Sequence, residues 1–264
     1  MRSWSDFIAS SGAHGAQVYS HAGELADPVA EYLAAGFELG EPVVVVATPE
    51  HWAQFARGLT SRGWDAWRLA DQGLLTLADA DAMLRACMEG RAPSAEAFER
   101  EIGGLLDGVA TRFPNRWIRA FGEMVDLLCR RGNAEAAAKL EDLWNDLALT
   151  RHFSLLCGYG LDVFDQGSQL TPLPDVCRAH AHVETSADPT RFAEAVDLAL
   201  EEVLGPLEAG RVYMMVGEQI REEHAAPPQL ALMWVSENMP LRANHVLSRA
   251  RANYYGNPIR FAAV

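Results

Sequence analysis

The chain alternates short apolar runs with longer stretches in which apolar residues recur at helical spacing. Between the runs, positions such as Leu25, Val29, Leu33 and Phe37 repeat every three or four residues and end at Gly40, as in an amphipathic helix. Five runs have the length and composition of strands: residues 16–20, 42–48, 74–80, 116–122 and 153–159. Strands that alternate with helices predict an α/β fold with a mostly parallel sheet and helices on both faces. The run "PVVVVAT" has the continuous apolar character of a strand buried on both faces.

The pattern changes near residue 165. Residues 123–149 are predicted to be helical with an interruption at Gly132, whereas residues 165–175, "DQGSQLTPLPD", are rich in turn formers. Beyond this stretch the signals are helical, with Asp188 as a helix cap and prolines at expected helix starts. We therefore predict an α/β domain over residues 1–183 and a helical C-terminal subdomain over residues 184–264.

Charge and composition argue against nucleic-acid-binding, membrane and secreted proteins. The formal net charge of −14 repels phosphate backbones and anionic lipid, so neither nucleic acid nor a membrane is an expected partner. The longest apolar run, "VVVVA", is too short to span a bilayer, and the first 15 residues lack the apolar segment of a signal peptide. A cytoplasmic location is expected. The four cysteines form no C-x-x-C pair and should be reduced thiols, with Cys87 and Cys129 in the core.

The segment "YSHAGELADP", residues 19–28, stands where a nucleotide-binding α/β protein carries its phosphate loop. It has one glycine, Gly23, and lacks the lysine and the Ser or Thr that such a loop places against phosphates and magnesium. Glu24 and Asp27 stand at the expected helix start, where carboxylates repel an anion. The sequence therefore argues against ATP hydrolysis, and enzymatic activity is not expected.

Polar residues follow several of the predicted strands. Open α/β sheets bind ligands at the carboxyl ends of their strands, so these residues are candidates for a common site. They are Ser20 and His21, Thr48 with His51, Asp79, Glu123, and Cys157 with Tyr159. For Thr48 and Asp79, helix capping is the better interpretation.

Several blocks together resemble a known family. They are "AHGAQVYS", "RAFGEMVDLL", "LEDLWNDL", "FSLLCGY" and "CRAHAHV", in this order. This set is similar to the sensory domain called MEDS, from methanogen/methylotroph DcmR sensory, and the resemblance runs from His14 to Val183. Residues 58–84 also resemble RecA/KaiC-like ATPases, so the resemblance implies a RecA/KaiC-like fold with a degenerate phosphate loop.

The resemblance implies a signal-input domain that recognises a small organic molecule and reports to a partner. Relatives often carry a DNA-binding or histidine-kinase module, and no such module is visible in this sequence. The expected partner is therefore a separate signalling protein, such as a histidine kinase or a transcription regulator. A homo-oligomer is a reasonable expectation by analogy with RecA-like proteins. The sequence does not identify a cofactor.

Individual residues leave alternatives open. His14 and Tyr19 are an odd number of positions apart, so a continuous strand places them on opposite faces. Tyr19 either lines the crevice or packs in the sheet with its hydroxyl satisfied. Glu123 either contacts a ligand or caps the next helix, while Asp126 is expected to be solvated. The predicted ligand-binding residues are His14, Tyr19, His21, Glu123, Cys157, Tyr159, Cys177 and His180.

The cluster "CRAHAH" supports a different hypothesis. Cys177, His180 and His182 offer sulfur and imidazole ligands for a metal, although the leading prediction assigns none. In a strand the two histidines would share a face, and in a helix they would diverge. Three functions remain: a small-molecule sensor, which we favour, an interaction module with a vestigial nucleotide crevice, and a metal-binding protein that uses this cluster.

Overall fold

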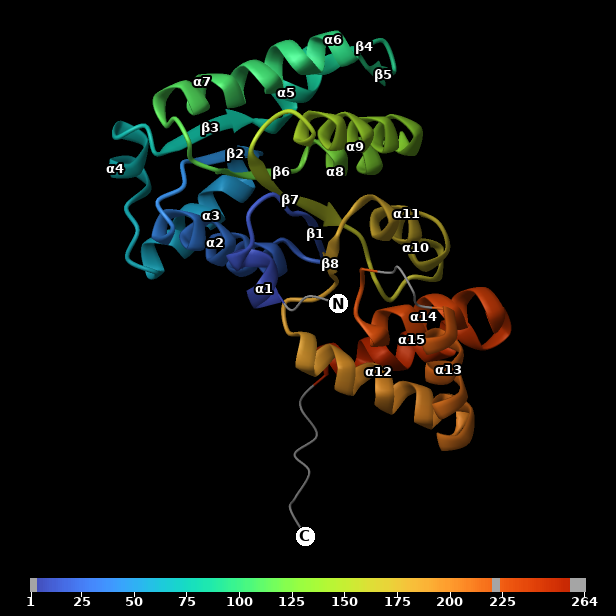
Figure 1. Ribbon diagram of the computed structural model, residues 1–264. Helices are drawn as coiled ribbons and strands as arrows, with labels where there is room; N and C mark the ends of the chain where they lie inside the picture. The colour runs from blue at the N-terminus through green and yellow to red at the C-terminus, as the bar shows by residue number, and fades with distance from the viewer. Residues whose placement is uncertain (1–3, 220–223, 257–264) are drawn as a thin grey trace.

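A six-stranded sheet organises the protein. The computed structural model describes residues 4–219 and 224–256. The strands follow the order β3 (Leu75–Asp79), β2 (Val43–Ala47), β6 (Ile118–Gly122), β7 (Phe153–Gly160), β1 (His14–Tyr19) and β8 (His182–Glu184). All neighbouring pairs are parallel (Figure 1). The predicted α/β fold with a mostly parallel sheet is confirmed, and each of the five predicted strands is present.

Helices cover both faces of this sheet. One face carries α1 (Trp4–Ala9), α2 (Ala22–Glu38), α3 (Pro49–Ser61) and α4 (Ala66–Asp71). The other carries α5 (Ala80–Cys87), α6 (Ala95–Phe98), the π-turn Glu99–Gly103, α7 (Gly104–Arg112), α8 (Met124–Arg130) and α9 (Ala134–Ala148). A short hairpin, β4 (Met88–Glu89) and β5 (Ala92–Pro93), follows α5. Because both faces are covered, every residue of β2 is buried, as the unbroken valine run predicts.

The interruption predicted in the long helix after β6 is confirmed. Gly132 adopts a φ of +69° between α8 and α9, a backbone conformation that glycine tolerates because it has no Cβ. Asn133 then caps α9 by accepting a hydrogen bond from the amide of Ala136. The chain thus turns between two helices that pack on the same face of the sheet.

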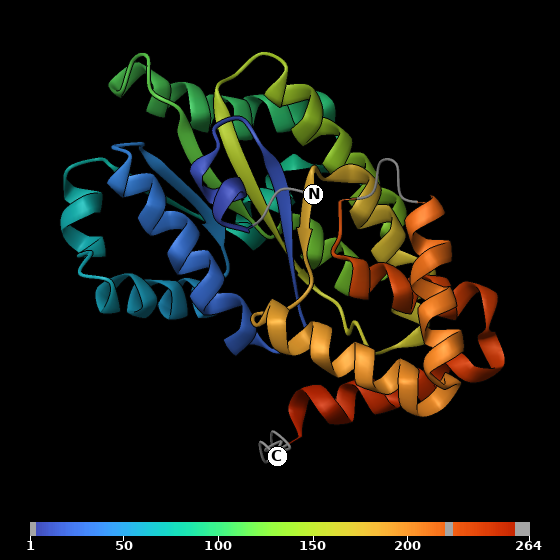
Figure 2. The same cartoon turned by 60° about the horizontal axis from the view of Figure 1, so that its bottom comes forward.

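The C-terminal part is helical, as predicted. After β7 come α10 (Gln166–Leu170) and α11 (Pro172–Ala179), and after β8 come α12 (Pro189–Leu204), α13 (Pro206–Gln219), α14 (Pro227–Asn238) and α15 (Pro240–Tyr255). Each helix after β8 begins with proline, whose missing N–H costs nothing in the first turn. Asp188 caps α12 through the amide of Arg191. Figure 2 shows these helices on the side of the molecule opposite α3 and α4.

The hydrophobic core continues from the sheet into these helices. Phe164, Phe192 and Tyr254 bring their rings within 6 Å of one another, and they belong to the same buried cluster as the residues beneath α8 and α9. A buried hydrogen bond of 2.7 Å from Gln229 to Gln169 also joins α14 to α10. The division at residue 183 stays a prediction about folding units, because no break in the core marks it.

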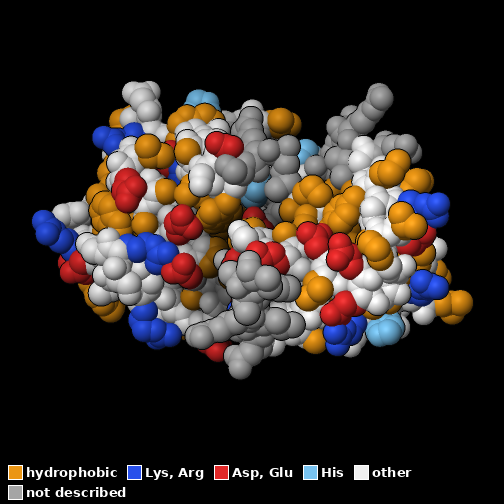
Figure 3. All heavy atoms as spheres, turned by 90° about the horizontal axis from the view of Figure 1, so that it is seen from below, with side chains coloured by type: hydrophobic (Ala, Val, Ile, Leu, Met, Phe, Trp, Pro, Cys, Tyr) orange, Lys and Arg blue, Asp and Glu red, His pale blue; other side chains and the backbone are white. Residues whose placement is uncertain are grey.

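The surface of the C-terminal helices is mixed in character. Leu207, Met214 and Leu241 are strongly exposed on α13 and α15. In the view from below, apolar and acidic side chains stand next to each other, and Lys and Arg side chains are scattered over the face (Figure 3). Among the described helices, none combines the length and the apolar character needed to cross a bilayer.

Candidate functional site

Carboxylates of this chain occupy the turn where a phosphate loop would lie. The side chain of Glu24 accepts hydrogen bonds from the backbone amides of Ser20, at 2.9 Å, and His21, at 3.2 Å. Tyr255, at the end of α15, donates its hydroxyl to the same carboxylate at 2.8 Å. His21 itself is exposed and lies beside the Tyr255 ring. The N-terminus of α2 therefore already holds a negative charge, which disfavours a bound phosphate.

Glu123 lies at the carboxyl end of β6, at the edge of the sheet where this turn also lies. It stands directly before α8, but its carboxylate does not cap that helix. It accepts a hydrogen bond from the amide of Thr48 and pairs with Nδ1 of His51, so it ties the end of β6 to the start of α3. The capping alternative for Glu123 is wrong, because its carboxylate bonds the Thr48 amide and the His51 ring and not the first amides of α8. Thr48 and Asp79 do cap their helices, as predicted.

Asp126, in α8, is the third carboxylate at this edge of the sheet. It is buried rather than solvated, so that prediction is wrong. Its Oδ1 accepts from the Gly160 amide at 2.7 Å, and its Oδ2 accepts from the Tyr19 hydroxyl at 3.0 Å and pairs with Arg130 at 2.7 Å. Burial raises the pKa values of both Asp126 and Tyr19. The Tyr19 hydroxyl thus has its hydrogen-bond partners inside the protein.

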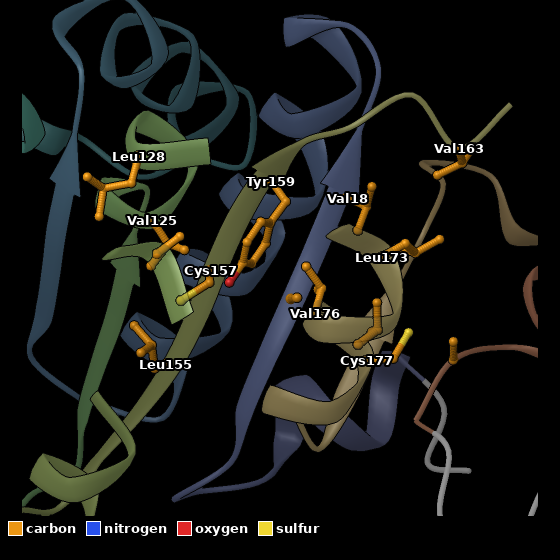
Figure 4. Close-up of a cluster of buried hydrophobic side chains, with 14 of the residues drawn as sticks. Val18, Val125, Leu128, Leu155, Cys157, Tyr159, Val163, Leu173, Val176 and Cys177 are labelled. Atoms are coloured by element: carbon orange, nitrogen blue, oxygen red, sulfur yellow. The ribbon is translucent and has the colours of Figure 1, made fainter. Parts of the chain in front are cut away.

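A second group of polar side chains lies on one face of the sheet rather than at its edge. In the pairing of β1 with β7, His14 lies opposite Leu155 and Ala16 lies opposite Cys157. Alternation along the strands then places His14, Cys157 and Tyr159 on the face covered by α8 and α9. Tyr19 belongs to the core of the opposite face, as its odd spacing from His14 predicts. Figure 4 shows Cys157 and Tyr159 on β7, between α8 and α11.

Two helices complete this group. Glu141 comes from α9, and His180 follows the last residue of α11. The ligand atoms of His14, Glu141, Cys157 and His180 all lie within 4.8 Å of one another. We call these four residues the face cluster. Three of its members are predicted ligand-binding residues, and Glu141 is one that the sequence reasoning missed.

The contacts within the face cluster are close. His14 Nε2 lies 3.4 Å from Cys157 Sγ and 3.4 Å from Glu141 Oε2, and His180 Nε2 lies 3.5 Å from Glu141 Oε1. Tyr159 donates its buried hydroxyl to Glu141. The ring centroids of His14 and His180 are 4.3 Å apart. The structure therefore brings together residues that are up to 166 positions apart in the chain.

Cys177 and His182 do not join His180, which corrects the grouping proposed for "CRAHAH". Among the described residues, the group of potential metal ligands contains neither of them. Helix α11 ends at Ala179, and the strand β8 then directs His182 to the opposite face, where its ring stacks on Phe7 at 5.0 Å. Cys177 is buried on α11, and Figure 4 shows its sulfur pointing away from Cys157.

A cavity of about 420 Å³ opens beside the face cluster, between α8, α9, β7 and α11. Its lining is mainly apolar, and its polar residues are Glu141, Asp142, Asn145, Tyr159, Asp175 and Arg178. Asn145 also accepts a hydrogen bond of 2.9 Å from His14 Nδ1, so the cavity and the cluster share side chains. Pockets of this size and character accommodate small organic molecules.

A family model for the MEDS domain, the methanogen/methylotroph DcmR sensory domain, matches residues 13–181. The chain belongs to the MEDS family. A comparison with curated proteins gave no match. The matched region of the MEDS domain begins one residue before His14 and ends one residue after His180, so it contains the whole face cluster.

Burial is the largest single influence on the pKa values of His14, Glu141, Cys157 and Tyr159 in this MEDS site. Burial, together with the charge of His180, lowers the pKa of His14 to about 4. Burial tends to raise the pKa of Glu141, but His180, His14 and the Tyr159 hydroxyl outweigh it and lower the value to about 2. Burial and the Glu141 charge raise the pKa values of Cys157 and Tyr159 well above their ordinary range. At neutral pH the cluster therefore holds a carboxylate, a neutral His14 and an undissociated thiol and phenol.

Proposed function

We propose that this MEDS protein senses a small organic molecule that binds in the cavity beside the face cluster. Family membership supports a sensory or regulatory role. The observation that carries the ligand proposal is the cavity itself, with about 420 Å³ of space and a mainly apolar lining that includes several polar side chains. The amides at the carboxyl ends of the strands already have carboxylate partners, so we place the ligand on the sheet face. A ligand role for Tyr19, His21 and Glu123 stays a prediction.

The cavity lining limits the chemistry of the ligand. Alanine, valine and proline side chains on α9 and α11 favour a compact, mainly apolar body. Glu141 and Tyr159, two of the polar residues in the lining, favour a ligand with one polar group that forms hydrogen bonds. Glu141 carries a negative charge, and Arg178, the arginine of the lining, is paired with Asp175, so an alcohol, an amide or an amine suits the cavity better than an anion.

The position of α11 gives a physical basis for a response. This helix forms one wall of the cavity and follows α10 directly in the chain. Helix α10 is bonded to α14 through Gln169 and Gln229. A ligand that shifts α11 would therefore disturb the C-terminal helices. We propose that these helices report to a separate signalling protein, such as a histidine kinase or a transcription regulator.

A cavity-filling substitution tests the ligand site. Ala138 lines the cavity from an exposed position on α9, and Ala148 is an exposed alanine at the end of the same helix, outside the cavity. A panel of short-chain alcohols, amides and amines would be screened by thermal shift and isothermal titration. We expect a panel member to bind the wild type and Ala148→Trp, and to lose at least tenfold in affinity for Ala138→Trp.

The same screen can contradict the proposal. Equal binding to both tryptophan variants would place the ligand elsewhere. Failure of the whole panel would favour the interaction-module hypothesis, which the carboxylate-filled edge of the sheet also supports. In that case affinity capture with the full chain should recover a signalling protein that the C-terminal helices retain without any ligand.

A further inference from the structure

We infer that the face cluster, His14, Glu141, Cys157 and His180, is a binding site for one divalent transition-metal ion of the zinc class. This inference goes beyond the proposed sensing of an organic ligand, because it depends on the cluster and not on the cavity. The two sites are neighbours that share Glu141 as a common wall.

The spacing of the ligand atoms fits a tetrahedral ion. With bonds of about 2.0–2.2 Å to nitrogen and oxygen and about 2.3 Å to sulfur, ligand atoms around zinc lie roughly 3.3–3.7 Å from one another. The separations in the structure are 3.4 Å for His14 Nε2 to Cys157 Sγ, 3.4 Å for His14 Nε2 to Glu141 Oε2, and 3.5 Å for His180 Nε2 to Glu141 Oε1. These three separations match a tetrahedral site, and all four ligand atoms lie within 4.8 Å of one another.

The hydrogen bonds of the two histidines also support a metal site. His180 Nδ1 lies 2.8 Å from the carbonyl oxygen of Val176, which can only accept, so Nδ1 carries the proton. His14 Nδ1 makes the corresponding contact with Asn145 Oδ1 at 2.9 Å. Nε2 is then the ring nitrogen of each histidine that faces the carboxylate of Glu141. Partners of this kind on the second nitrogen are typical of histidines that bind metal.

Unsatisfied atoms mark the centre of the cluster. Among the described residues, His180 Nε2 and Glu141 Oε2 are buried without a hydrogen-bond partner. The His180 side chain is 0% exposed, so water does not compensate for the missing bond. Buried polar groups left unpaired destabilise the folded state. A cation bound between His180 Nε2 and Glu141 Oε2 would give both atoms a partner.

The donor set indicates which metal fits. Two imidazoles, one thiolate and one carboxylate suit zinc and similar borderline ions, whereas Mg²⁺ and Ca²⁺ prefer oxygen ligands. The thiolate and the carboxylate together carry two negative charges, which a divalent ion neutralises, so the complex is neutral in its buried setting. Four protein ligands fill a tetrahedral shell, which is the arrangement of a structural site.

Cysteine variants provide the first test. Full-length protein, without a histidine tag, would be loaded with Zn²⁺ or Co²⁺, dialysed and analysed by elemental mass spectrometry and absorption spectroscopy. We expect one ion per chain and a sulfur-to-cobalt charge-transfer band. Cys157→Ser should abolish this band and weaken zinc binding at least tenfold, whereas Cys177→Ser, which changes a buried thiol outside the cluster, should alter neither.

The outcomes separate this site from the proposed ligand cavity. Ala138→Trp should leave zinc loading unchanged, because Ala138 lines the cavity and lies outside the cluster. If Cys157→Ser does not fold, His14→Asn at the partly exposed end of the cluster should still lower the zinc affinity at least tenfold. Wild-type protein that stays metal-free after loading, or equal loading of Cys157→Ser and Cys177→Ser, would overturn the inference.

Discussion

Glu184 should make the folded state less stable as the pH rises, and Glu184→Gln should remove that effect. This side chain lies in β8 at the edge of the sheet and is 7% exposed. Burial raises its pKa from 4.5 to about 7, although the amides of Thr185 and Ser186 oppose the rise. Glutamine has nearly the same shape and keeps an oxygen that can accept from the Thr185 amide, which is 3.1 Å from the carboxylate.

The sign and size of the effect follow from the two pKa values. Between pH 4.5 and 7 the folded protein retains a proton on Glu184 that the unfolded chain has lost, so the free energy of unfolding falls as the pH rises. Above pH 7 both states are ionised and the loss is complete. Each unit of pKa difference corresponds to about 1.4 kcal/mol, so the full loss is about 3 kcal/mol.

Urea unfolding at pH 4.5 and pH 8 measures this linkage directly. The free energy of unfolding of Glu184→Gln, relative to wild type, should rise by about 3 kcal/mol between the two pH values. Glu89→Gln, which changes an exposed glutamate on the β4–β5 hairpin, controls for the general loss of one negative charge. A stability difference between Glu184→Gln and wild type that is the same at both pH values would refute the reasoning.

Two further substitutions test the carboxylates at the edge of the sheet. Asp126→Ala leaves the Gly160 amide and the tyrosine at the end of β1 without their acceptor, so it should cost about 3 kcal/mol in urea unfolding. Asp81→Ala removes a partly exposed ion pair with an arginine and should cost less than about 1 kcal/mol, and equal losses would count against this account. Tyr255→Phe removes the exposed hydrogen bond to Glu24 and should lower the free energy of unfolding by about 1 kcal/mol. A loss above about 3 kcal/mol, measured in the same way, would mean that the tyrosine hydroxyl has a larger role in attaching α15.

The architecture could be predicted because its signals are local. The valine run of β2 and the interruption at Gly132 each follow from residues that are adjacent in the sequence. The opposite faces of His14 and Tyr19 likewise follow from their spacing within one strand. Such features depend on backbone geometry, and the tertiary structure did not override them.

The composition of the face cluster could not be derived from local signals. Glu141 meets His14 and His180 only because α9 and α11 pack on the same face of the sheet. Asp142, the next residue, has a similar side chain and is exposed. A weak signal was present: Glu141 and Asn145 are four positions apart, and they lie beside the buried Leu140 and Trp144 on α9. Two polar residues at helical spacing on a largely buried face indicate a partner across the core.

The contrast between the two polar regions distinguishes this sheet from one that binds a nucleotide. A nucleotide site at the carboxyl edge depends on backbone amides that remain free to bind phosphate. In this chain, Glu24, Glu123 and Asp126 accept hydrogen bonds from such amides, so the edge is already neutralised. On the sheet face of the described structure, the Glu141 carboxylate keeps one oxygen, Oε2, buried without a hydrogen-bond partner. A buried carboxylate attracts cations and hydrogen-bond donors. The sheet face therefore favours ligands of the opposite charge to phosphate.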